Sequence, residues 1–132
     1  MTAEARRSMT SDVPESVRQL IAQNIGSVSE LEALLLLHEH RVRAWTLAEA
    51  EERLYVRGDE LARLFGRLVD RGFFVVREGR YLYAAPPDVD ETVKELARFY
   101  AQHVVAVTNI IHANTSQSVR ELTEAVRRRR EE

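Results

Sequence analysis

Residues 55–85 contain six arginines. Four of these are spaced so that they could form a surface that binds phosphate or the edge of a base. Arg63 and Arg67 stand about one helical turn apart, and Arg77 and Arg80 flank a Glu-Gly pair. A planar guanidinium forms paired hydrogen bonds with phosphate oxygens or with guanine, whereas lysine is a point charge. The pattern therefore indicates contact with nucleic acid.

Two other interpretations of these arginines stay open. Asp59 precedes Arg63 by four residues and Asp70 follows Arg67 by three. At this spacing, side chains on a solvated helix face form weak ion pairs worth about 0.3–0.5 kcal/mol each. Contact with another protein is the third interpretation, and Glu60 favours it because a carboxylate near a DNA groove repels phosphate.

Residue types for other chemistry are missing or badly spaced. The chain has no cysteine, which excludes disulfides, thiolate zinc sites and cysteine catalysis. His38 and His40 are two residues apart, which separates their rings on a helix, and His103 and His112 are nine residues apart. There is no glycine-rich phosphate loop and no credible Ser-His-Asp arrangement. We therefore expect no enzyme activity, no metal and no cofactor.

The composition is that of one ordinary globular domain with added helices. The chain has 132 residues, of which 45% are hydrophobic and 30% charged. No apolar run approaches the ~20 residues that a membrane-spanning helix needs. Arg6 and Arg7 are not followed by the apolar stretch of a secretory signal. The sequence predicts a cytoplasmic protein with no membrane partner.

Charge is distributed unevenly along the chain, although the formal total is only −2. Residues 28–54 hold six acids and three arginines, a balance of −3. Residues 55–85 hold six arginines and four acids, a balance of +2. The segment with the candidate arginines is therefore locally basic, even though the whole protein has no field that would draw it to nucleic acid.

Apolar spacing and capping residues predict the elements that position these arginines. We expect a flexible tail over residues 1–12 and an N-terminal helix within 13–27. The second helix is capped by Ser27 or Ser29, and Thr46 with Glu49 forms a capping box for the third. The remaining expected elements are a small strand over Arg41–Trp45, helices over Leu47–Leu54 and from an Asp59 cap to Gly72, and hairpin strands over Phe73–Val76 and Tyr81–Ala84.

The order of helix, small strand, two helices and hairpin over Val28–Ala85 resembles the winged helix-turn-helix family of transcription regulators. The resemblance implies a mostly α, α+β fold, with residues 28–87 as the winged domain. It also implies that Asp59–Arg71 is the recognition helix in the DNA major groove, and that Val75–Tyr83 is the wing. The DNA-binding residues it implies are Arg57, Arg63, Gly66, Arg67, Arg77 and Arg80.

Residues 88–132 are predicted to form long C-terminal helices that make a dimer. Asp88 and Glu91 suggest a capping box for one helix reaching His112, and a last helix follows from Ser118. A heptad seam on the first helix is formed by Val89, Val93, Leu96, Tyr100, His103, Val107 and Ile110. His103 in this seam is a core-edge residue or a pH-sensitive element of the dimer. Helices on both sides of the winged domain resemble the order in the MarR and PadR groups, although the wing differs from the usual MarR pattern.

These observations predict a homodimeric repressor that binds duplex DNA, with a small-molecule or protein effector left open. The alternative is a winged-helix adaptor that binds another protein and does not bind DNA directly. Asp59 and Glu60, the acids over Glu49–Glu52 and the net charge of −2 favour the adaptor.

Overall fold

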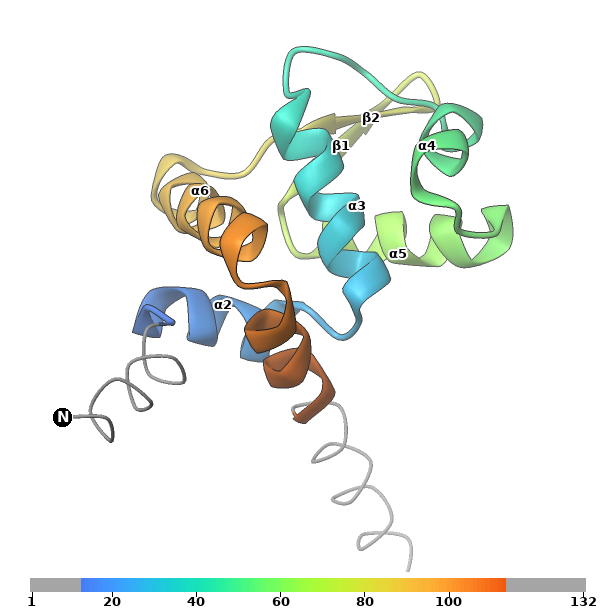
Figure 1. Cartoon of the computed structure of the whole chain (residues 1–132). Coiled ribbons are helices and arrows are strands. Elements are labelled where there is room, and N and C mark those ends of the chain that lie inside the picture. The colour runs from blue at the N-terminus through green and yellow to red at the C-terminus, as the bar shows by residue number, and fades with distance from the viewer. Residues whose placement is uncertain (1–12, 114–132) are drawn as a thin grey trace, which may run out of the picture.

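The computed structural model describes residues 13–113, and most of these residues are helical (Figure 1). The elements in chain order are α2 (Glu15–Asn24), α3 (Val28–Glu39), α4 (Leu47–Leu54), α5 (Gly58–Asp70), β1 (Phe74–Arg77), β2 (Arg80–Tyr83) and α6 (Pro87–Gln102). A further short helix follows at Val104–Ala113. The predicted α+β, winged-helix-like fold is confirmed. The predictions for residues 1–12 and for the helix after Ser118 lie outside the described residues.

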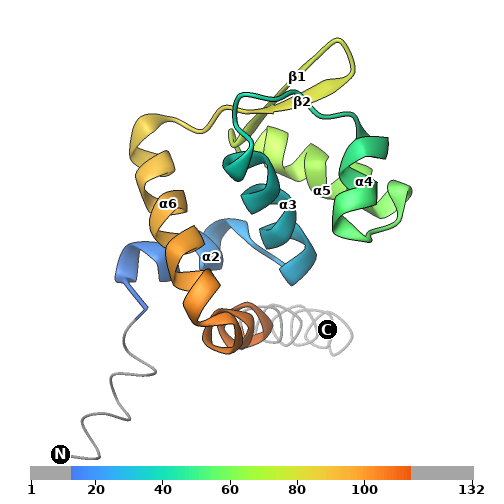
Figure 2. The same ribbon diagram turned by 45° about the horizontal axis from the view of Figure 1, so that its top comes forward.

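Helices α3, α4 and α5 pack together beneath the hairpin, and α2 and α6 lie to one side of them (Figures 1 and 2). The apolar residues of α5 recur every three or four positions, so they share one face and are buried against this core. They are Leu61, Leu64, Phe65 and Leu68, each at most 5% exposed. Phe65 also contacts the hairpin edge-on, with ring centroids 5.3 Å from Phe74 and 4.9 Å from Tyr81.

Two of the predicted helix caps are present, and the one predicted at Asp59 is wrong. The Ser27 hydroxyl accepts a hydrogen bond from the Glu30 amide at 3.1 Å. Thr46 and Glu49 form the full capping box at the start of α4. Asp59 is not the cap of α5, because the Leu61 amide already donates to the Arg57 carbonyl at 2.8 Å. That bond makes Arg57 the N-cap and puts Asp59 in the first helical turn.

The predicted strand over Arg41–Trp45 is reduced to a single residue. Helix α3 runs to Glu39, and a turn follows in which the Arg43 amide bonds to the His40 carbonyl at 3.0 Å. Only Trp45 then reaches β2, exchanging backbone hydrogen bonds of 2.8 and 2.7 Å with Tyr81. The residues predicted to form the strand before Trp45 form this turn instead.

The hairpin agrees with the prediction of a Glu-Gly turn. Strands β1 and β2 are antiparallel, and Arg77 is opposite Arg80 next to the turn. Glu78 and Gly79 have φ angles of 54° and 75°. Two consecutive positive φ angles are typical of the tight turn whose twist matches that of the paired strands.

The predicted single helix from the Asp88 cap to His112 is wrong. Helix α6 begins after Pro86 without a side-chain cap, and it ends at Gln102. His103 leaves the helical conformation at φ −134°, and its ring stacks on Phe99 with centroids 4.4 Å apart. The Val107 amide then bonds to the His103 carbonyl and starts the next helix. The heptad seam therefore crosses a bend, which periodicity alone does not reveal.

Several seam residues pack into the core of the same chain. Val93, Leu96 and Val107 are fully buried, while Val89, Tyr100 and Ile110 are partly buried beside them. The dimerisation role of the seam stays a prediction. Within residues 13–113, no single helix is both long and apolar enough to cross a membrane, and α2 with α3 meets that test only as a pair bent by 114°.

Candidate nucleic-acid interface

The outer face of α5 carries the central candidate residues. Arg63 and Arg67 lie opposite the buried stripe, as the helical period predicts. Gly66 sits between them, and a Cβ added there would meet nothing within 4 Å. The face is therefore open to a second surface, and Asp59 and Asp70 are exposed at its ends.

Arg63 is the arginine best placed to meet a ligand. Its side chain is exposed, and no other described residue forms a hydrogen bond or an ion pair with it. Arg77 on β1 is likewise exposed and without such a partner among residues 13–113. Free guanidinium groups keep all their donors for an external acceptor such as phosphate.

Arg67 is already in contact with a carboxylate of the protein. Its Nη1 atom lies 3.8 Å from Glu30 Oε2, although the Arg67 side chain is 56% exposed. The other Glu30 oxygen lies 2.6 Å from Arg71 Nη1. The sequence suggested only a capping role for Glu30, because nothing in its local pattern shows that α5 lies across it.

Arg80 on the wing is tied to α4 through Glu49. Arg80 Nη1 lies 3.5 Å from Glu49 Oε1, and Arg43 Nη2 lies 2.8 Å from Glu49 Oε2. Hydrogen bonds from the Thr46 amide and hydroxyl, and then from Arg43, hold the pKa of Glu49 below its usual range. Glu49 is therefore ionised at neutral pH, and it holds two arginines near the wing.

Arg43 and Arg53 also lie close to Trp45. The Arg43 guanidinium is 3.8 Å from the centroid of the indole ring, and Arg53 is 5.9 Å from it. The two arginines, Trp45, Glu49 and Glu52 line a shallow hollow of about 260 Å³. Arg43 and Arg53 were not among the predicted site residues, although arginines close to a tryptophan are a visible signal in the sequence.

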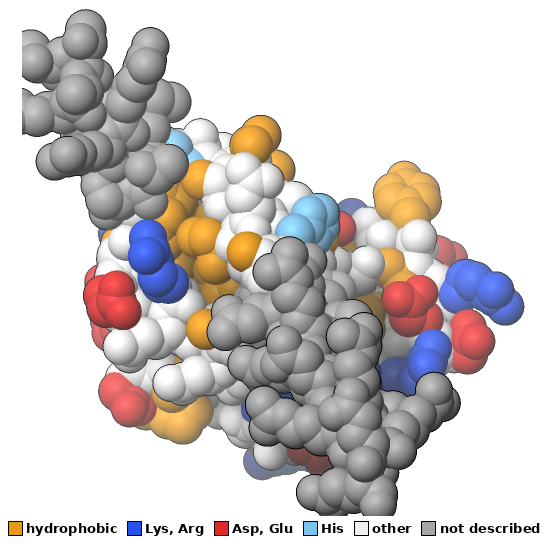
Figure 3. All heavy atoms as spheres, turned by 90° about the horizontal axis from the view of Figure 1, so that it is seen from below, with side chains coloured by type: hydrophobic (Ala, Val, Ile, Leu, Met, Phe, Trp, Pro, Cys, Tyr) orange, Lys and Arg blue, Asp and Glu red, His pale blue; other side chains and the backbone are white. Residues whose placement is uncertain are grey.

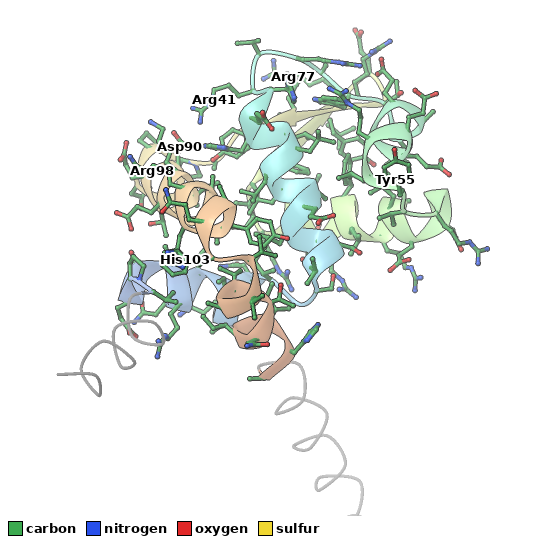
Figure 4. All side chains as sticks on the ribbon, viewed as in Figure 1. Arg41, Tyr55, Arg77, Asp90, Arg98 and His103 are labelled. Carbon is green, nitrogen blue, oxygen red and sulfur yellow. The ribbon has the colours of Figure 1, made fainter. Side chains whose placement is uncertain are left out.

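The turn between α4 and α5 presents two side chains to solvent. Tyr55 is 95% exposed and has a left-handed backbone with φ 54°; Figure 4 labels it near the junction of α4 and α5. Arg57 is 86% exposed and lies 3.7 Å from Asp59. Sequence analysis missed Tyr55, since the expected residue at such a helix end is glycine or asparagine.

The candidate residues form two groups, one on α5 and one around the wing. Helix α4 lies between them, in contact with α5 and joined to the wing by the Arg80–Glu49 pair (Figure 1). Its exposed residues Glu51 and Glu52 interrupt the basic surface. Figure 3 shows acidic and basic side chains intermixed on this side of the molecule, at the right of the view.

No protein-family model matches this chain, and no curated protein matches it. It aligns with a solved structure described as apo (heme-free) PefR, with 14% sequence identity, 95% of this chain and 99% of that chain covered, and a TM-score of 0.46. The function is therefore judged from the residues of this chain.

Two further features lie away from the arginine groups. An open pocket of about 350 Å³ lies between α2, the residues that follow α5 and the start of α6, and both polar and apolar side chains line it. Within the described part of the chain, no three His, Cys, Asp or Glu side chains gather to hold a metal ion. The chemistry that the described surface offers is binding of anions by exposed arginines.

Proposed function

We propose that this protein binds duplex DNA as a winged-helix regulator of transcription. The observation that carries the proposal is Arg63, an exposed guanidinium without a described partner on the open face of α5. In this arrangement α5 enters the major groove, where Arg63 binds a base edge or a phosphate. Gly66 lets the helix approach the DNA closely, because no side chain stands between Arg63 and Arg67.

The wing and the turn supply backbone contacts in this proposal. Arg77 and Arg80 bind phosphate beside the groove, and Arg57 does so at the start of α5. Arg80 must share its guanidinium with Glu49, so we expect it to contribute less than Arg77. Contacts of this kind position a protein on DNA without reading its sequence.

We further propose that the protein is a homodimeric repressor, with residues 28–87 as the DNA-binding unit and 13–27 and 88–132 as its flanking helices. The support is the exposed apolar surface of the helix Val104–Ala113, where Val104 is 48% and Val105 is 72% exposed. A two-fold dimer doubles the phosphate contacts and reads two half-sites about one helical turn apart.

The test is fluorescence anisotropy of a labelled duplex of mixed sequence, titrated with the protein at ~50 to 200 mM salt. We expect affinity to fall steeply with salt, and Arg63→Ala to weaken binding and to reduce the steepness of log K against log salt by about one for each protomer bound. Arg98→Ala is the matched control, because Arg98 is exposed on α6 and lies across the molecule from Tyr55 (Figure 4). Absence of binding by the unaltered protein at the lowest salt would overturn the proposal.

A protein-binding adaptor is the second candidate, and the acidic surface of α4 and early α5 favours it. Glu51, Glu52, Asp59 and Glu60 are all exposed there. Heparin at low salt separates the two candidates: retention that depends on Arg63 supports DNA binding, while free passage supports the adaptor.

A further inference from the structure

The carboxylate of Glu30 is completely buried, although it stands in the first turn of a helix. It is the only charged side chain buried to this degree among residues 13–113. One oxygen accepts a hydrogen bond from the Gly26 amide at 3.1 Å. A buried carboxylate is strongly unfavourable unless cations or donors surround it, so its neighbours must compensate for the lost water.

The compensating cations come from α5, far along the chain. Arg71 forms the tight pair, with 2.6 Å between Nη1 and Glu30 Oε1, and it also donates to the Asn24 carbonyl. Arg67 forms the loose pair at 3.8 Å. Arg71 therefore anchors the end of α5 to the junction of α2 and α3, while Arg67 is held at the edge of the same carboxylate.

We infer that Glu30 is a positioning residue that restrains Arg67 and competes with DNA phosphate for its guanidinium. The inference rests on the proposed DNA-binding function. Arg67 is 56% exposed, so it can turn outward to a phosphate, but doing so weakens its pairing with a carboxylate that water cannot reach. Arg63 has no such competitor among the described residues. Glu30 thus limits how much of the positive charge of α5 is available to DNA.

The test compares Glu30→Gln with Glu32→Gln in the anisotropy titration. Glutamine keeps the shape of the side chain and one acceptor oxygen, in place of the two oxygens that Gly26 and Arg71 use, and it removes the charge that holds Arg67. Glu32 is the matched control, because it lies on the same helix, is exposed and loses the same charge. With one more phosphate contact available in each protomer, we expect Glu30→Gln to steepen the salt slope by about one per bound protomer, an additional ~3.5-fold loss of affinity per protomer between ~50 and 200 mM salt.

Glu30→Gln is also made in a protein that carries Arg67→Ala. This comparison shows whether Glu30 acts by restraining Arg67 or only supports the fold. In the Arg67→Ala protein we expect Glu30→Gln to leave the salt slope unchanged. The inference is overturned if Glu30→Gln behaves like Glu32→Gln, or if its effect persists without Arg67.

A second comparison does not depend on the folding of the Glu30 variant. Because Arg67 is partly neutralised, Arg67→Ala should lower the salt slope by less than half as much as Arg63→Ala. Equal losses would overturn the inference while leaving the proposed function intact. If the unaltered protein fails to bind DNA, both the proposed function and the inference about Glu30 are wrong.

Discussion

The Tyr83 hydroxyl donates a hydrogen bond to Asp90 Oδ1 at 2.7 Å, which joins the last residue of β2 to the first turns of α6. Arg41 donates to both oxygens of the same carboxylate, at 3.1 and 3.2 Å. In Figure 4, Arg41 and Asp90 lie next to each other at the point where α6 passes the end of α3. The wing, α6 and the loop that follows α3 therefore meet at the carboxylate of Asp90, whose side chain is only 13% exposed.

Replacing Tyr83 by phenylalanine should destabilise the protein. The change removes the hydroxyl from a hydrogen bond to a charged group, and we expect the free energy of unfolding to fall by about 1–2 kcal/mol. Urea denaturation measures the change. In an Asp90→Asn background the loss should be clearly smaller, and equal losses in both backgrounds would show that the hydroxyl does not act through Asp90.

Stability should fall as the pH is lowered from about 7, partly because of His38. Burial, and then the nearby Arg41 charge, lower the pKa of His38 below its usual value, in spite of Asp90 at 3.7 Å. The unfolded chain therefore takes up a proton at higher pH than the folded chain, so stability is full above about pH 6.5 and falls as the pH drops through the folded pKa. His38→Phe keeps a ring beside Tyr83 and should flatten this part of the curve in urea titrations at pH 5 to 8. An unchanged slope would contradict the assignment.

A second pH effect belongs to Asp90 at more acidic pH. Burial alone would raise its pKa, but hydrogen bonds from Tyr83 and Arg41 hold the pKa below its usual range. Asp90 therefore contributes stability that is present above about pH 4 and is lost as the pH falls through the folded pKa. Urea titrations between pH 2 and 5 should show a shallower decline for Asp90→Asn, and a decline as steep as that of the unaltered protein would exclude this role.

The exposed ring of Tyr55 stands in the turn before α5, so in the proposed complex it should contact DNA, whereas its left-handed backbone should lower stability. A left-handed backbone costs a residue with a side chain about 1 kcal/mol relative to glycine, and Tyr55 is too exposed to recover that cost by packing. We expect Tyr55→Gly to raise the melting temperature and to weaken binding in the anisotropy titration. Tyr55→Ala is the control: it should weaken binding equally without the gain in stability. If both variants bind like the unaltered protein, the ring has no role at the DNA.

The proposed dimer predicts that Val105→Asp shifts the protein to a monomer. A charge on this exposed apolar helix cannot be buried against a second copy without a large desolvation cost. Sedimentation velocity should show a dimer for the unaltered protein and a monomer for the variant. Val42→Asp is the control, since Val42 is 95% exposed in the loop after α3 and should leave the dimer intact. A monomeric unaltered protein would refute the dimer.

Local chemistry accounts for the parts of the fold that were correctly predicted. The apolar spacing of α5, the capping box of Thr46 and Glu49, and the turn at Glu78 depend on residues close in the chain. The wrong predictions concern where elements begin and end: the caps at Asp59 and Asp88, the strand before Trp45, which is limited to the one residue that meets β2, and the helix that breaks at His103. Trp45 pairs with β2, and the His103 ring stacks where α6 ends.

The outward direction of Arg63 and Arg67 follows from the sequence alone, because a helical period of 3.6 residues puts them opposite the apolar stripe of α5. Which of the two is free depends instead on how the helices pack. Arg67 meets Glu30 of α3, and Arg63 meets no described carboxylate. An ion pair depends on the distance between atoms in space, and the chain brings Glu30 to α5 only when α3 packs across it.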